Sequence, residues 1–254
     1  MSFPAAAPIA KTAARRGLTF VGCLLLSLAA TSEASASPAG GSSGSLSQAL
    51  KHSLTEATDS GSARITVQFV SGSATGKVVQ DSSLQSGEQT VAIGKELAST
   101  VLVGGAAYIS GNRQGLTSYF GLPSAVVPTV TGKWVSVQPT DAAFRSVSAN
   151  VALASALANV TPSGTLVAGK RSKVDRKWVN SISGEAPGGG ERLTLFVAAT
   201  KRALPVEAVE SGGSGKSATG EIVTFTRWGE QVHVPTPSGA LPLSAIQAAS
   251  SASG

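Results

Sequence analysis

Residues 191–235 constrain the fold of this chain more than any other stretch. Short runs rich in β-branched and aromatic residues occupy 191–197, 204–210 and 220–229, and Val232-His233-Val234-Pro235 follows them. Charged or glycine-rich segments separate the runs, and this spacing is typical of strands joined by turns in an antiparallel meander. The stretch therefore predicts a β-rich domain.

The predicted strands carry large apolar residues on both faces. Leu195 and Phe196 point to opposite faces of one strand, and Phe225 and Trp228 point to opposite faces of another. An antiparallel sheet with one solvated face shows a clean alternation of apolar and polar residues instead. Either one face packs on helices while the other lines a cavity, or the sheet is one layer of a packed two-layer sandwich.

Further strands are predicted along the chain before this stretch. Residues 64–70 alternate strictly, with Ile65, Val67 and Phe69 on one face. Weaker strand patterns occupy 76–80, 89–93, 100–103, 107–110 and 134–137, and 165–179 predicts two strands joined by a basic turn. Strands at such regular intervals favour a continuous meander over βαβ units.

Two stretches predict amphipathic helices. Ser45 and Gln48 form a capping box, and Leu46, Leu50 and Leu54 recur at helical spacing before Gly61. A longer helix is predicted over 139–159, and its apolar stripe consists of Phe144, Val147, Val151, Ala154 and Ala158, widened by Leu153 and Leu157.

Residues 111–133 form a long apolar segment that contains Pro123 and Pro128. An apolar loop of this length is unusual in a compact domain unless it is functional or packed. It is either a flap beside the mouth of a cavity or a buried cover on the core.

Residues 204–235 also carry a resemblance to a known family. Leu204-Pro205-Val206, a glycine-rich turn, and a strand 223–229 before Val232-His233-Val234-Pro235 resemble the C-terminal part of the actinobacterial LppX/LprG-type lipoproteins. The resemblance extends more loosely over 46–235. It implies the LolA-like lipoprotein-carrier fold, in which a strongly curved antiparallel sheet forms a half-barrel and binds acyl chains.

The N-terminus has the layout of a secretory signal peptide. Lys11, Arg15 and Arg16 precede the apolar stretch 18–30, and the small-residue motif 34–36 follows it. We expect cleavage after Ala36, although an uncleaved membrane anchor is the alternative. The apolar run follows Cys23 instead of preceding it, so this cysteine departs from the family's lipid-anchoring pattern. A soluble secreted protein is therefore expected, and lipidation at Cys23 is the alternative.

The charge pattern says little about partners. The chain has a net charge of +6, and a cluster of basic residues comprises Lys170, Arg171, Lys173, Arg176 and Lys177. Such a cluster can contact anionic lipid headgroups or a polyanionic cell wall, or it can be a solvated turn. Nucleic acid is a poor fit for an exported chain with few aromatic residues beside its basic groups.

No pattern of residues indicates catalysis, a metal site or a cofactor. Residues 212–217 lack the first glycine of a phosphate-binding loop and precede a strand, not a helix. The pattern Gly-x-Ser-x-Gly at 40–44 lies in a flexible linker, which supplies no preceding strand. The chain holds two histidines, His52 and His233, and neither has metal-ligand spacing to a carboxylate. We expect no enzymatic activity.

These observations predict an α+β fold with one domain. Residues 1–36 are assigned to the signal peptide, 37–45 to a flexible linker, 46–235 to a curved antiparallel sheet with two main helices on one side, and 236–254 to a disordered tail. The predicted function is binding of a lipid or acylated molecule in a sheet-lined cavity by a monomeric envelope protein, as carrier or sensor. The alternative is an envelope interaction module with a packed core. Candidate cavity residues, chosen by residue type and strand position, are Phe69, Tyr119, Phe196 and Phe225.

Overall fold

The computed structural model describes residues 43–71, 74–189, 191–212 and 219–252. The predicted signal peptide, Cys23 and most of the glycine-rich turn 212–217 lie outside these residues, as does the linker up to residue 42. Helix α2 (Ser43–Asp59) already includes residues 43–45, so the last part of the predicted linker is helical.

Within the described residues, thirteen strands form one sheet. The strands are β1 (Ser62–Ser71), β2 (Ala74–Ser83), β3 (Gly87–Ile93), β4 (Glu96–Val103), β5 (Ala106–Gly111), β6 (Val135–Val137), β7 (Ser163–Ala168), β8 (Ser172–Val174), β9 (Lys177–Glu185), β10 (Arg192–Ala198), β11 (Pro205–Gly212), β12 (Thr219–Thr226) and β13 (Leu241–Pro242). The other helices are the π-helical turn η1 (Gly115–Tyr119), α3 (Val127–Val130), α4 (Phe144–Ala149), α5 (Leu153–Asn159) and α6 (Leu243–Ala252).

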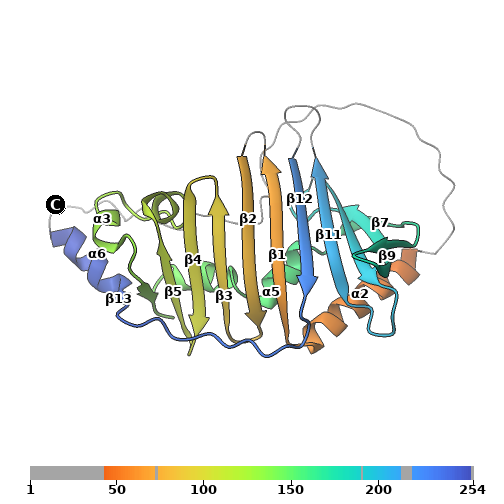
Figure 1. Ribbon diagram of the computed structural model, residues 1–254, viewed down its shortest axis with the longest axis horizontal. Helices are drawn as coiled ribbons and strands as arrows, with labels where there is room; N and C mark the ends of the chain where they lie inside the picture. The colour runs from red at the N-terminus through yellow and green to blue at the C-terminus, as the bar shows by residue number, and fades with distance from the viewer. Residues whose placement is uncertain (1–42, 72–73, 190, 213–218, 253–254) are drawn as a thin grey trace.

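The sheet consists of two meanders that meet in its centre. Its order is β13-β6-β5-β4-β3-β2-β1-β12-β11-β10-β9-β7, and β8 pairs with β9. All pairings are antiparallel except a two-residue parallel contact between β13 and β6. The sheet is open and curved, with α2 and α5 on one side (Figure 1). The predicted fold class, α+β with a curved antiparallel sheet, is confirmed.

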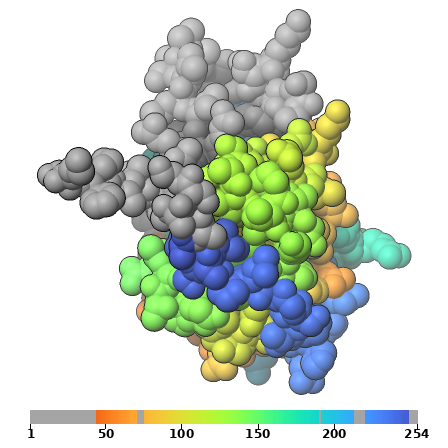
Figure 2. Space-filling model, turned by 90° about the vertical axis from the view of Figure 1, so that its left-hand side faces the viewer, coloured from red at the N-terminus to blue at the C-terminus, as the bar shows by residue number. Residues whose placement is uncertain are grey.

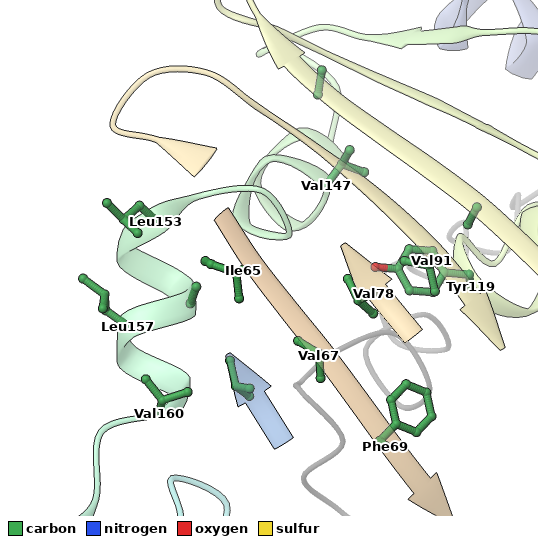
Figure 3. Packing of buried hydrophobic residues seen from close by; sticks show 14 of the residues in the cluster. Ile65, Val67, Phe69, Val78, Val91, Tyr119, Val147, Leu153, Leu157 and Val160 are labelled. Carbon is green, nitrogen blue, oxygen red and sulfur yellow. The ribbon is translucent and has the colours of Figure 1, made fainter. Parts of the chain in front are cut away.

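The inner face of the sheet, which the helices cover, holds the core. Ile65 lies opposite Phe225 and Val67 lies opposite Val223 across the β1–β12 pair, and all four are buried. Figure 3 shows Ile65, Val67 and Phe69 along β1, together with Leu153 and Leu157 of α5. Because every described strand belongs to one sheet, the two-layer sandwich is wrong.

The outer face is mainly polar, contrary to the expectation of two apolar faces. Thr66 pairs with Thr224, and Thr90 pairs with Ser99 on the same face. Trp228, which the alternation placed opposite Phe225, instead stacks on it with ring centroids 5.5 Å apart. The alternation fails because β12 ends at Thr226 and Arg227 adopts a positive φ of 54°, which turns the chain back toward the core.

The predicted long helix 139–159 is broken into α4 and α5. The backbone carbonyls of Asn150 and Val151 accept hydrogen bonds from Gln89 and Ser82 of the sheet. These contacts replace helical hydrogen bonds at the break. Because α5 begins at Leu153, its buried side differs from the predicted apolar stripe. Ala154 and Ala158 are exposed, while Leu153 and Leu157 are buried. The broken helix connects β6 at one end of the sheet to β7 at the other.

The C-terminal residues are ordered against the sheet, so the predicted disordered tail is wrong over 236–252. The predicted strand 232–235 is also wrong, because these residues make no strand pairing. They run along the ends of the strands to the far edge, where β13 pairs with β6 (Figure 1). Leu243 is buried, and Leu241 and Ile246 pack on the core. In Figure 2 these residues (blue) lie against residues from the middle of the chain (green).

Candidate functional site

The candidate ligand site is a groove between α2 and the edge strand β7, with a volume of about 530 Å³. Helical spacing places Leu50, Leu54 and Ala57 on one side of α2. Leu50 and Ala57 are buried in the core, whereas Leu54 is only partly covered. The groove therefore lies where the inner face of the sheet reaches its edge and α2 covers it incompletely.

Apolar side chains form the floor of the α2–β7 groove. Leu50 and Leu54 face it from α2, and Pro162 and Leu166 face it from the β7 side. The remaining lining residues are mostly polar and comprise Ser47, Lys51, Thr55, Thr58, Asp59, Ser163 and Gly164. Small-molecule sites combine apolar lining with polar groups and span about 300–1,000 Å³, and the α2–β7 groove has a volume in this range. The groove can thus hold an apolar chain.

The structure does not bring the four predicted cavity residues together. Phe69 and Phe225 are buried on the inner face, and Tyr119 is buried on η1. Phe196 pairs with Glu207 on the outer face, where it is half-buried. None of the four is among the described residues that line the α2–β7 groove. The sequence analysis chose these four by residue type and strand position. Leu54 and Leu166 could not be chosen in that way, because they line the groove only through the packing of α2 beside β7.

Residues 111–133 form a cover on the core. Leu116, Val127 and Val130 are fully buried, and the rings of Tyr119 and Phe120 pack edge to face with centroids 4.9 Å apart. Of the two interpretations of this segment, the buried cover agrees with the structure. The apolar residues that suggested a flap are packed beneath the backbone instead of facing solvent.

A buried polar network lies on the inner face beside this cover. The Gln89 side chain donates to the Gln80 side-chain oxygen at 3.0 Å, and the Tyr119 hydroxyl donates to the Gln89 side-chain oxygen at 2.8 Å. Gln80 donates in turn to Ser82. Both glutamines are 1% exposed. Burial raises the pKa of Tyr119 and keeps its hydroxyl protonated as a donor.

The network joins β2, β3, η1 and the break between α4 and α5. Sequence reasoning missed it, although a signal was present. Gln80 and Gln89 occupy strand positions that share the inner face with Val78 and Val91. A polar residue in the apolar phase of a strand needs a buried partner, since an unpaired amide costs free energy.

Three glutamates lie at the same edge of the sheet, beside the start of β10, the end of β11 and the start of β12. Glu210 pairs directly with Glu221 across the strands, and Glu191 precedes β10. The pKa of Glu221 is raised to about 7, first by burial and then by the charge of Glu191. The pKa of Glu210 is also raised, by burial, by its hydrogen bond with Glu191 and by the neighbouring carboxylates. The pKa values in this cluster are thus raised well above the ordinary range of a carboxyl group.

Two other kinds of functional feature are absent from the described residues. Across the described residues, no group of three or more His, Cys, Asp or Glu side chains has a geometry that could hold a metal ion. No helix among them is long and apolar enough to cross a membrane.

A second hollow of about 810 Å³ lies over the ends of β1, β2, β11 and β12, and its lining includes the exposed Val70 and Ile222.

The chain was compared with known proteins at three levels. No protein-family model matches it, and no curated protein matches it significantly. Solved structures of similar arrangement include the Mycobacterium tuberculosis lipoprotein LppX, with a TM-score of 0.49 and 15% identity over 76% of this chain and 100% of that one.

Two other solved structures are less similar. The Pseudomonas aeruginosa MucA/MucB complex gives a TM-score of 0.36 at 13% identity, covering 79% of this chain and 60% of that one. A putative outer membrane lipoprotein-sorting protein domain from Vibrio parahaemolyticus gives 0.28 at 5% identity, covering 81% and 98%. Known lipoproteins and lipoprotein-sorting domains are therefore among the structural neighbours, at identities too low to assign this chain to a family.

Proposed function

We propose that this protein is an exported cell-envelope protein that binds the acyl chain of a lipid or acylated molecule, as a carrier or sensor. The single observation that carries the proposal is the apolar α2–β7 groove. Its floor consists of Leu50, Leu54, Pro162 and Leu166, of which Leu54 and Leu166 are partly exposed at the edge of an otherwise buried core. The proposal assigns binding to this groove and no catalysis.

Hydrophobic burial is sufficient to hold such a ligand. Each methylene that leaves water contributes about 0.8 kcal/mol before the costs of association are counted. A chain of methylenes lying along Leu54 and Leu166 therefore needs no charged anchor. The exposed Thr55 hydroxyl at the rim can donate to a polar head group, whereas the Thr58 hydroxyl already donates to the Leu54 carbonyl oxygen at 2.9 Å.

Export is the second part of the proposal. The N-terminal segment has the charge, apolar run and small-residue motif of a signal peptide, and removal after Ala36 gives a soluble envelope protein. The motifs in 204–235 support membership of the LppX/LprG-type family, which we propose on those residues alone.

A packed interaction module is the second candidate. One observation favours it: a continuous buried cluster occupies the inner face, and residues 111–133 close over it. In that case the groove is a surface irregularity, and ligand binding is absent.

The test is binding of a fluorescent long-chain fatty acid to the wild type and to Leu54→Ser. We expect saturable binding to the wild type and an affinity lowered about tenfold or more in the variant, because several apolar contacts are lost. Leu84→Ser is the matched control, since Leu84 is exposed on the β2–β3 turn and does not line the groove.

Native mass spectrometry of protein purified from its own host, followed by organic extraction, identifies the natural ligand. A co-purifying lipid supports the carrier. No saturable binding to the wild type, or an equal loss in the Leu84→Ser control, leaves the packed module as the function.

A further inference from the structure

We propose that the hairpin formed by β8 and the start of β9 docks this protein on an anionic lipid bilayer. The docking surface, here called the Trp178 hairpin, comprises residues 170–178. It lies at the β7 end of the molecule, beside α2 (Figure 1). The inference concerns the partner of a surface, so it stands whether or not the α2–β7 groove binds an acyl chain.

The geometry of the hairpin places two cations over an exposed aromatic ring. Lys173 pairs with Trp178 across the strands. The Lys173 ammonium lies 4.8 Å from the Trp178 ring centroid, and the Arg171 guanidinium carbon lies 5.1 Å from it. Asp175 and Arg176 form the tight turn with positive φ angles of 45° and 66°. The pairing and the turn therefore hold the ring and its cations at the tip.

The surface carries an exposed aromatic ring as well as charge. Trp178 is 50% exposed. Trp134 and Trp228, the other tryptophans, are half-buried. Burial of a large aromatic side chain is favourable, so binding to a partner that covers the exposed Trp178 ring is stabilised. Tryptophan rings are enriched at the headgroup level of membranes for this reason.

The basic charge of the hairpin is largely uncompensated. Five basic residues face one acid, Asp175, within 170–177. In the described part of the chain, none of the five lies within ion-pairing distance of a carboxylate. Basic residues near an anionic leaflet each strengthen binding about fivefold. Charge complementarity therefore selects an anionic partner.

A bilayer fits this combination better than a soluble polyanion. A polyanion such as nucleic acid is bound by basic grooves in which several aromatic residues stack on bases. Residues 163–189 contain one aromatic residue, Trp178. One half-exposed aromatic ring with two cations over it matches the headgroup layer of a bilayer, where apolar and charged groups are both satisfied.

The experiment measures binding of the full chain to vesicles by flotation and tryptophan fluorescence. The vesicles contain phosphatidylcholine alone or phosphatidylcholine with phosphatidylglycerol. We expect binding only to the second kind, with a blue shift of emission and weakening as salt is added, since salt screens exposed charges. Trp178→Phe should remove most of the blue shift, because the other two tryptophans are already half-buried.

The decisive comparison uses two double variants with the same charge change. Arg171→Gln with Lys173→Gln should lower the partition coefficient about 30-fold, as expected for two lost basic groups. Lys95→Gln with Lys133→Gln, exposed residues near the opposite end of the sheet, should change it by less than about twofold. Because every variant carries the same N-terminal segment, the difference reports the hairpin.

Several outcomes overturn the proposal. These are no binding to phosphatidylglycerol vesicles, equal binding to phosphatidylcholine, or equal losses in the two double variants. Binding to heparin or DNA with no binding to vesicles assigns the hairpin to a soluble polyanion instead. The fatty-acid assay is independent of all of these, so failure of docking and failure of the ligand proposal are distinguishable.

Discussion

At the scale of single residues, polar side chains on the inner face determine how the core is held together. Gln80 and Gln89 occupy positions that alternation reserves for apolar residues, and each is satisfied by a partner from another element. The network fixes both the π-helical turn that carries Tyr119 and the break that follows α4. Its hydrogen bonds cannot be replaced by water, because the residues are buried.

Tyr119→Phe tests this network. The substitution keeps the ring but leaves the Gln89 side-chain oxygen without the donor it has at 2.8 Å. We expect the free energy of unfolding in urea to fall by about 1–3 kcal/mol, the cost of an unsatisfied buried acceptor. The second tyrosine offers the control, since Tyr108 is half-buried on β5. Tyr108→Phe should change stability by less than about 0.5 kcal/mol. Equal effects would show that the network contributes no stability.

The glutamates at the ends of β11 and β12 make stability depend on pH. The pKa of Glu221 is raised to about 7 in the folded protein by burial and by the charge of Glu191. In the unfolded chain this carboxyl loses its proton near pH 4.5, so between these values the folded state holds more protons. The free energy of unfolding therefore falls as pH rises from about 4.5 to about 7.

Glu221→Gln should remove much of this dependence. The neutral amide resembles the protonated carboxyl, so the variant should match the wild type near pH 5 and exceed its stability near pH 8, by up to about 3 kcal/mol. Glu210, whose pKa is also raised, remains and retains part of the slope. Urea unfolding at both pH values measures the difference, with Glu88→Gln on the exposed outer face as the control. A parallel pH profile in wild type and Glu221→Gln would contradict the assignment.

At the scale of elements, the helices are defined by what they contact more than by their own sequence. α4 and α5 are short because sheet side chains bind the carbonyls between them. α2 packs against α5 and the β7 edge, and its incomplete cover leaves the candidate groove open. β13 and α6 form because the edge strand β6 offers both hydrogen-bonding groups and an apolar surface.

Leu243→Ala tests whether α6 belongs to the fold. Leu243 is 5% exposed, at the point where the C-terminal segment reaches the core. We expect the free energy of unfolding to fall by about 2–5 kcal/mol, as for other buried leucine truncations. Leu84→Ala, on an exposed turn, should change it by less than about 0.5 kcal/mol. A loss as small as that of Leu84→Ala would show that α6 is not docked in solution.

At the scale of the whole molecule, the first strand of the sheet pairs with the last long strand at its centre. β1 follows the first helix, and β12 is the last long strand, yet they pair over eight residues from Arg64 to Ser71. The crossover through α4 and α5 spans the inner face from β6 to β7, and residues 227–240 return along the strand ends to β13. The candidate groove and the Trp178 hairpin consequently lie at one end of the sheet, and the C-terminal helix lies at the other.

Much of this architecture could be predicted from the sequence. Alternation of apolar residues is a local property, so the strands in 64–110 and 191–226 and the first helix follow from it, although only the second half of β4 was predicted. The meander followed from the short turns between them. The α+β class with helices on one side of the sheet followed as well, because apolar helical stripes must be buried against it.

The tertiary structure alone decided the remaining features, which depend on contacts between residues far apart in the chain. The helix break at Asn150 depends on Gln89, and the position of Trp228 depends on the hydrogen bond that its indole N–H donates to the Pro205 carbonyl oxygen. The tail is ordered because Leu243 meets the core near the far edge of the sheet. The groove at Leu54 and Leu166 exists because one helix covers the sheet edge incompletely. Periodicity shows which side of an element is apolar, but only packing determines what that side meets.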